Sequence, residues 1–295
     1  MNRLSFLKLL STAPLTKPTI KLSKLYYASK IFSNTDKTPV LFLGHGSPIN
    51  AIQENEFVTG FRNIAKTLPT TPNAILCISA HWYTNGTKVT AMEMPRTIHD
   101  FSGFPKELFE VQYPAKGSPA LAQNTKTILK PILVALDEKW GLDHGAWSVI
   151  KHLYPNANIP VVQLSIDYTK PASYHYQLAQ KLNTLRHKGV LIIGSGNIIH
   201  NLRLVDFSNF DKPNYGYDWA IEAKEFINNH LYKGDYKPLI NYEKQSKALQ
   251  LAIPTPDHYL PLIYALGLQQ KKESIALFND KLVAGSLSMT SLKIS

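Results

Sequence analysis

The sequence has little cysteine and no long apolar run. Its 295 residues include one cysteine, Cys77, which lies in the apolar segment 74–79. A single cysteine excludes a disulfide framework, so we expect Cys77 to be a small core residue. No segment approaches the ~18 uninterrupted apolar residues that a transmembrane helix needs. The sequence therefore predicts no membrane span, and its 44% hydrophobic and 18% charged residues are typical of a globular protein.

Acidic residues are also scarce, but the positive excess is concentrated in one part of the chain. The 21 Asp and Glu against 32 Lys and Arg give a net charge of +11. Residues 1–38 hold seven Lys or Arg against one acid, Asp36, and so carry more than half of this excess. The rest of the chain shows no dense basic stripe interleaved with aromatic side chains, which nucleic-acid binding surfaces favour. We therefore expect no nucleic-acid partner.

Residues 1–38 show no strand pattern and are predicted to form a basic N-terminal extension outside the folded domain. Lys8 interrupts the short apolar stretch near the start, so this segment is a poor secretory signal. Its basic, Ser/Thr-containing and acid-poor composition fits an organelle transit peptide, and it also fits a disordered or loosely docked extension. We expect a cytoplasmic protein, with targeting by this segment as the alternative.

From residue 39 onward, short apolar runs alternate with segments of helical spacing. The near-continuous runs, typical of strands buried on both faces of a parallel sheet, cover 39–43, 74–78, 160–166 and 189–193. The helical segments cover 54–68, 118–129, 173–186 and 218–231. Segments 85–93 and 284–293 are candidates for further strands. We predict one α/β domain, residues 39–295, with a mostly parallel central sheet flanked by helices.

Three histidines follow separate strands of this predicted sheet. His45 follows the first run, His81 follows the second, and His200 comes shortly after the fourth. Ligands of open α/β sheets bind beyond the carboxyl ends of the strands, so we expect the active site there. A lone histidine after a strand is more often structural, but three at one edge, two of them beside glycines, indicate a shared task. Their wide spacing is unlike a zinc finger and suits a site that the fold assembles.

Three further histidines have distinctive settings. His144 lies in a loop-like, glycine-containing stretch, where Asp143 is placed to orient its ring. His258 follows two prolines that disfavour a helix before it, so we expect it to open one. His99 lies in a polar, glycine-containing loop from which it could reach a substrate.

Motifs for other common chemistries are absent from the sequence. It contains no phosphate-binding Gly-x-x-x-x-Gly-Lys-Ser/Thr loop, no Gly-x-Gly-x-x-Gly opening a helix and no Gly-x-Ser-x-Gly elbow. Ser47 lies near His45, but a proline follows it and a serine nucleophile is weakly supported. The residues therefore predict a mononuclear, histidine-rich metal site. Zinc, iron and copper all suit imidazole, which leaves open a zinc Lewis acid or an iron(II) site with open positions.

Seven short motifs, spread along the chain, carry a resemblance to one enzyme family. The sequence resembles the class III extradiol ring-cleavage dioxygenases, and within them the 4,5-DOPA dioxygenase branch. The similarity runs from about residue 39 to the C-terminus. The motifs that carry it are Gly44-His-Gly-Ser-Pro48, Ser79-Ala-His-Trp82, Thr97-Ile-His-Asp-Phe-Ser-Gly-Phe-Pro105, Tyr113-Pro-Ala-Lys-Gly-Ser-Pro119, Gly141-Leu-Asp-His-Gly-Ala-Trp147, Gly194-Ser-Gly-Asn-Ile-Ile-His-Asn201 and Thr255-Pro-Asp-His-Tyr-Leu-Pro261.

The resemblance implies one divalent metal ion per chain, iron(II) for dioxygenase activity or zinc as the bound metal. It implies His45, His81 and His258 as metal ligands, and His200 as either a further ligand or an acid/base residue. It implies His144 as a second catalytic residue that faces substrate and oxygen. The expected reaction opens the ring of a catechol such as DOPA with molecular oxygen, giving a muconic semialdehyde.

The substrate pocket and the competing functions are less defined. His99 and Trp82 are candidate substrate-binding residues, together with Phe101 and Phe104, although aromatic residues this close to strands are as often core. A zinc-dependent hydrolase using the same histidines is one alternative function. A non-enzymatic binding member of the fold is another, against which the intact histidine set argues. Assembly into a homo-oligomer is compatible with the sequence.

Overall fold

The computed structural model describes residues 34–210 and 212–295. Most of the predicted extension 1–38, with its targeting alternative, therefore lies outside the described residues. Its last residues run along the domain, where the Thr35 amide donates to the His187 carbonyl and the Thr38 hydroxyl donates to the Val190 carbonyl. Within the described ranges, no helix is long and apolar enough to cross a membrane.

A six-stranded sheet forms the centre of the domain, in the order β6-β2-β8-β1-β12-β9. The four strands from β6 to β1 run parallel, and β12 is antiparallel to both of its neighbours. The predicted mostly parallel sheet is therefore confirmed. The strands are β1 Val40–Gly44, β2 Ala74–Ser79, β6 Val161–Gln163, β8 Val190–Gly196, β9 Ile275–Phe278 and β12 Ser291–Ile294.

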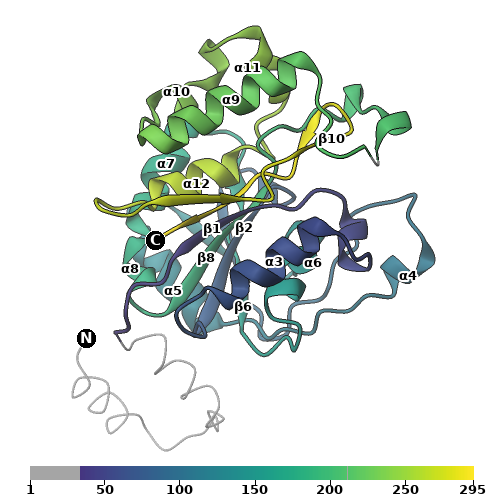
Figure 1. Cartoon of the computed structure of the whole chain (residues 1–295). Helices are drawn as coiled ribbons and strands as arrows, with labels where there is room; N and C mark the ends of the chain where they lie inside the picture. Colours follow the sequence, from purple (N-terminus) through teal and green to yellow (C-terminus); the bar gives the residue numbers. More distant parts are fainter. Residues whose placement is uncertain (1–33, 211) are drawn as a thin grey trace, which may run out of the picture.

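Helices cover both faces of this sheet (Figure 1). Successive side chains of a strand point to opposite faces. Val40 and Phe42 of β1 therefore pack toward α7 and α12, whereas Leu41 and Leu43 pack toward α3 and α6. α9, α10 and α11 lie outside α7 and α12. The α-helices are α3 Glu56–Lys66, α4 Lys106–Phe109, α5 Pro119–Ile128, α6 His144–Leu153, α7 Ala172–Lys181, α8 Asn183–Arg186, α9 Asp218–Lys233, α10 Lys237–Ile240, α11 Lys247–Ala252 and α12 Leu260–Gly267.

Local sequence explains where the predicted helices begin. Asn55 caps α3 by accepting a hydrogen bond from the Val58 amide, at 3.0 Å. Ser118 caps α5 in the same way, and Pro119 occupies the first helical position, where its missing N–H costs nothing. All four predicted helices form, and the segment 173–186 is divided between α7 and α8.

Short strands and 3₁₀ turns lie outside the main sheet, and they correct one prediction and confirm another. The run 160–166 is not one strand, because the chain leaves the sheet after β6 and then pairs with β3. The predicted strand 85–93 forms β4, but it pairs with β5 in a separate sheet. These elements are β3 Tyr83–Thr84, β4 Thr87–Thr90, β5 Val134–Asp137, β7 Ile166–Asp167, β10 Leu282–Val283, β11 Leu287–Ser288, η1 Pro48–Ala51, η2 Leu202–Leu204, η3 Phe207–Asn209 and η4 Tyr242–Lys244.

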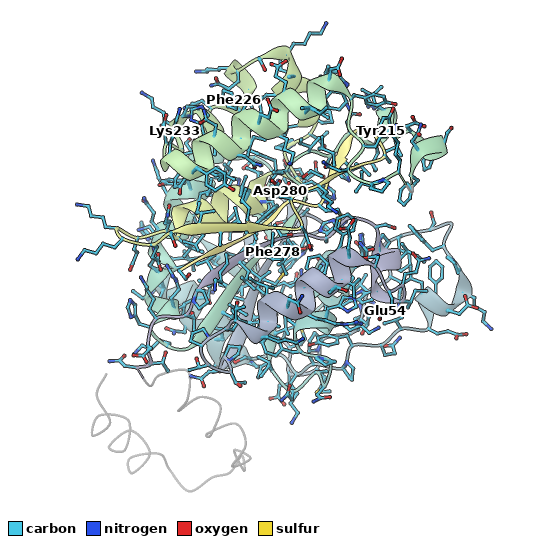
Figure 2. The ribbon with its side chains drawn as sticks, viewed as in Figure 1. Glu54, Tyr215, Phe226, Lys233, Phe278 and Asp280 are labelled. Carbon is cyan, nitrogen blue, oxygen red and sulfur yellow. The ribbon has the colours of Figure 1, made fainter. Side chains whose placement is uncertain are left out.

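Asp280 joins the C-terminal strands to helix α9 (Figure 2). Its carboxylate accepts hydrogen bonds from Asn228 of α9, at 3.0 Å, and from the Thr290 hydroxyl, at 2.8 Å. The ammonium of Lys224, also on α9, lies 3.1 Å away. The C-terminal segment, predicted as a further strand, is thus held against the domain and supplies β12 to the sheet.

Candidate metal centre

Three histidine side chains meet at the carboxyl edge of the sheet. One nitrogen of His45, one of His81 and one of His258 all lie within 4.8 Å of one another. The Nε2 atoms of His45 and His81 are 3.3 Å apart. His45 follows β1 directly and its amide donates to the Gly196 carbonyl of β8, while His81 lies two residues beyond β2. The predicted convergence of His45 and His81 is therefore present in the structure.

His258 reaches this edge because β8 ends in a glycine. A Cβ atom at Gly196 would lie 2.1 Å from the His258 carbonyl oxygen, so only glycine lets the two backbones approach so closely. The Asn197 amide donates to the same carbonyl, at 2.9 Å. His258 does not open a helix as predicted. It lies in a turn, and α12 begins at Leu260, with Pro261 in its first turn.

The hydrogen bonds of His45 determine which of its nitrogens carries a proton. The Ser195 hydroxyl donates its hydrogen to the Gly145 carbonyl, and His45 Nδ1 lies 3.0 Å from the same hydroxyl oxygen. Because Ser195 has one hydrogen to give, it must accept from His45 Nδ1–H. His45 Nε2 is then left with a lone pair that points toward the centre.

The other two rings each have a carboxylate beside Nδ1. His258 Nδ1 is hydrogen-bonded to the Asp257 carboxylate, and His81 Nδ1 lies 3.3 Å from Asp100 Oδ2. A carboxylate has no hydrogen to donate and repels a nearby lone pair, so both Nδ1 atoms favour the hydrogen and both Nε2 atoms favour the lone pair. Three lone pairs facing one point repel each other unless a cation lies between them. The donor set therefore fits one divalent metal ion of the kind that binds imidazole.

Burial favours the neutral, metal-binding form of His45 and His81. His45 is 2% exposed, and burial, reinforced by the neighbouring rings of His81 and His258, lowers its pKa well below the ordinary range. Burial and the nearby His144 and His258 likewise lower the pKa of His81, although Asp100 opposes this. Protons therefore compete weakly with a metal for these nitrogens near neutral pH.

His144 lies against His81 at the start of a helix. It is the first residue of α6 and not part of a loop, and its ring centroid lies 3.8 Å from that of His81. Asp143 caps α6 through the Ala146 amide and accepts from Ser79 and Gln163. The carboxylate beside the His144 ring is therefore Asp100, not Asp143 as predicted, with Oδ1 3.0 Å from Nδ1.

His200 stacks on His258 instead of joining the three converging nitrogens. The two rings are 3.6 Å apart between centroids and nearly parallel, at 11°. Burial and the neighbouring His258 lower the pKa of His200 to about 3. Its amide donates to the Ala252 carbonyl, which joins the end of β8 to α11. The side chain thus lies beside the candidate centre in a neutral form.

The two predicted substrate-binding residues contact different neighbours. His99 Nε2 lies 3.0 Å from the Val111 carbonyl, and its ring packs against Phe101, which in turn contacts the His144 ring. Trp82 is 3% exposed and stacks on Trp140. Both tryptophans, with His81, line a surface hollow of about 310 Å³. Their contact with substrate stays a prediction.

Comparison with known proteins identifies the family. The family described as the catalytic LigB subunit of aromatic ring-opening dioxygenase matches residues 39–286. This chain belongs to that family. It is 46% identical to the 4,5-DOPA dioxygenase extradiol of Escherichia coli (strain K12) over 90% of this chain and 97% of that protein. It is 36% identical to the protein of the same name from Beta vulgaris, over 86% and 95%.

A solved structure agrees with this assignment. The crystal structure of an uncharacterized protein from Escherichia coli K12 matches with a TM-score of 0.76 and 42% identity, over 88% of this chain and all of that one. The predicted family and α/β fold are confirmed, and the chain is an extradiol dioxygenase. These comparisons do not support the hydrolase or the non-enzymatic alternative.

Sequence reasoning missed the residues that orient the histidines. Asp100, Ser195 and Asp257 each contact a ring nitrogen, and none was a candidate. Asp257 directly precedes His258, and Asp100 directly follows His99, so adjacency to a candidate histidine was the available signal. Ser195 had no such signal, because its contact with His45 joins two strands.

Proposed function

We propose that this enzyme opens the ring of a catechol such as DOPA with molecular oxygen, next to the two hydroxyl-bearing carbons. The product is a muconic semialdehyde that contains both atoms of O₂ and every atom of the catechol. The observation that carries the proposal is the convergence of three ring nitrogens, one each from His45, His81 and His258, beside two further histidines. The relatives named as 4,5-DOPA dioxygenases support DOPA as the substrate.

We assign the metal to His45, His81 and His258. Bound there, iron(II) would supply a redox-active Lewis acid with open positions for the two reactants. Zinc fits the same nitrogens, so the donor set alone does not select the active metal. Holding both reactants at one place gives near-attack geometry, and the burial of His45 and His258 limits the access of water.

We assign proton transfer to His144 and His200. Nδ1 of His144 faces Asp100, so Nε2 is the atom that exchanges a proton with substrate. His200 lies outside the three converging nitrogens, and we assign it to acid/base chemistry and not to a fourth ligand position. The neutral imidazole of His200 accepts a proton from a catechol hydroxyl, and the protons removed on binding return before the product leaves.

Oxygen uptake by the iron-loaded enzyme tests this function. Protein purified without oxygen and loaded with iron(II) is expected to consume one O₂ per DOPA, and mass spectrometry with labelled oxygen is expected to find both atoms in the product. His81→Ala should abolish metal binding and turnover together, whereas His187→Ala should change neither, because this exposed histidine precedes β8 and so lies at the opposite end of that strand from the centre. An iron-loaded enzyme that consumes no oxygen with any catechol would overturn the proposal.

The limits of the catalytic domain are also part of the proposal. We place it at residues 39–295, which the family match over 39–286 supports, and leave 1–38 as an extension. A cytoplasmic location and assembly into a homo-oligomer stay predictions from the sequence.

A further inference from the structure

Asp100 lies between two histidines that the proposed function assigns to different tasks. Its Oδ2 lies 3.3 Å from Nδ1 of the metal ligand His81, and its Oδ1 lies 3.0 Å from Nδ1 of the proton carrier His144. The same Oδ1 accepts a hydrogen bond from the His144 amide, at 2.9 Å. One carboxylate therefore contacts both rings and also the first amide of helix α6.

The amide contact fixes which way the carboxylate faces. The His144 amide is one of the donors at a helix N-terminus that have no partner within the helix. Because Oδ1 satisfies it, the Asp100 carboxylate cannot rotate without losing this bond. Oδ2 is then held toward His81. The backbone of α6 also packs closely against the His81 ring at Gly145. A Cβ atom on this residue would lie 2.7 Å from His81 Cδ2.

We propose that Asp100 is a positioning residue that sets the tautomer of His81 and His144 together. A carboxylate oxygen this close to each Nδ1 repels a lone pair there and so favours Nδ1–H in each ring, which leaves both Nε2 atoms free for the centre. The metal ligand and the proton carrier thereby share one anchor. This inference rests on the proposed function for the roles of the two histidines, but not for the geometry.

Replacing Asp100 with asparagine tests the tautomer directly. An amide has one accepting oxygen and one donating nitrogen. The oxygen is expected to stay where it accepts from the His144 amide, which puts the nitrogen opposite His81. A donor there requires a lone pair on His81 Nδ1 and moves the hydrogen to Nε2, where it points at the metal position.

The measurement is the affinity of the metal-free enzyme for Zn²⁺ alone, by competition with a chromophoric chelator. We expect Asp100→Asn to weaken zinc binding roughly 10- to 100-fold, as is typical when the partner of a ligating histidine is lost. The matched control is Asp137→Asn. Asp137 lines the same surface hollow as His81, but its carboxylate accepts from the Lys139 and Trp140 amides and no described contact joins it to a histidine ring, so the control should bind zinc like the wild type.

A second readout separates positioning from a general structural effect. Nitrogen-15 spectra of the histidine rings in the metal-free protein are expected to show Nδ1–H for His81 in the wild type and Nε2–H in Asp100→Asn. The melting temperatures of the two Asp→Asn variants should agree within a few degrees. If Asp100→Asn does not fold, the wild-type spectrum decides, because Nε2–H on His81 there contradicts the proposal.

Wild-type zinc affinity in a folded Asp100→Asn protein would also overturn it. Failure of the proposed function is a separate result, seen as absent oxygen uptake by the wild type whatever its zinc affinity.

Discussion

Replacing Glu273 with glutamine should remove a pH-dependent part of the stability that comes from a buried ion pair. The Arg186 side chain is fully buried, and its guanidinium contacts both oxygens of Glu273. It also donates to the backbone carbonyls of Thr38 and Leu268. The ammonium of Lys37 lies 2.8 Å from Glu273. This group joins the start of the described chain to the segment after α12.

The magnitude follows from the carboxyl group. Burial alone would raise the pKa of Glu273, but the hydrogen bonds from Arg186 and Lys37 outweigh it and lower the pKa to about 2. Against an ordinary value of 4.5, this corresponds to about 3 kcal/mol of stability at neutral pH. Because the folded pKa is the lower one, the contribution is complete above the unfolded value and is lost as pH falls from about 4.5 to about 2.

The assay is denaturant unfolding of the wild type and Glu273→Gln at several pH values. At pH 7 we expect the free energy of unfolding of the variant to be about 3 kcal/mol lower, because removal of the Glu273 carboxylate leaves the buried guanidinium of Arg186 without a counter-charge. The difference should shrink as the pH approaches the folded pKa. Glu54→Gln is the matched control, because Glu54 also pairs with an arginine through both oxygens but is exposed at the surface (Figure 2).

A wild-type and a Glu273→Gln protein with the same stability at pH 7 would refute the reasoning. So would a difference that stays constant down to low pH, because it would show that the loss comes from packing and not from the charge. The control should change stability little at any pH.

Three further predictions concern the candidate centre. Ser195→Ala should leave His45 Nδ1–H unpaired and weaken zinc binding roughly 10-fold or more in a chelator competition, and unchanged affinity would contradict the assigned tautomer. Gly196→Ala should displace the turn that carries His258 and lower the metal content of purified protein, measured by elemental analysis, whereas full occupancy would show that the turn adapts. His200→Ala should keep wild-type metal content but lose at least ~100-fold in kcat of oxygen uptake, and loss of the metal would instead make His200 a ligand.

The sequence predicted the strands that carry the centre because they are buried on both faces. β1, β2 and β8 are fully buried, so each is a continuous apolar run, and a histidine that follows such a run is placed at the sheet edge by topology alone. His45 and His81 could therefore be found from position. The place of His258 depends on the close approach of two backbones at Gly196, which spacing does not reveal, and it came from the family resemblance.

Other features depend on contacts between distant segments. The run 160–166 reads as one strand, but the Ser165 amide donates to the Lys88 carbonyl of β4, and the chain then pairs with β3 outside the main sheet. His144 reads as a loop residue because glycine follows it, yet Gly145 is the residue that lets α6 pack against His81. Asp100 is an ordinary loop carboxylate in the sequence, and only the fold shows that two rings share it.

The turn that carries His258 has a consequence for the metal-free enzyme. Residues 253–259 form no regular helix or strand, and the His258 carbonyl joins them to the sheet by accepting from the Asn197 amide at the end of β8. His45 and His258 stand near opposite ends of the domain sequence, so an ion held by both acts as a cross-link that closes most of the chain into one loop. Removal of the ion should therefore raise the rate of hydrogen exchange at this turn before it affects the strands. The metal would then stabilise the fold as well as supply the reactive centre.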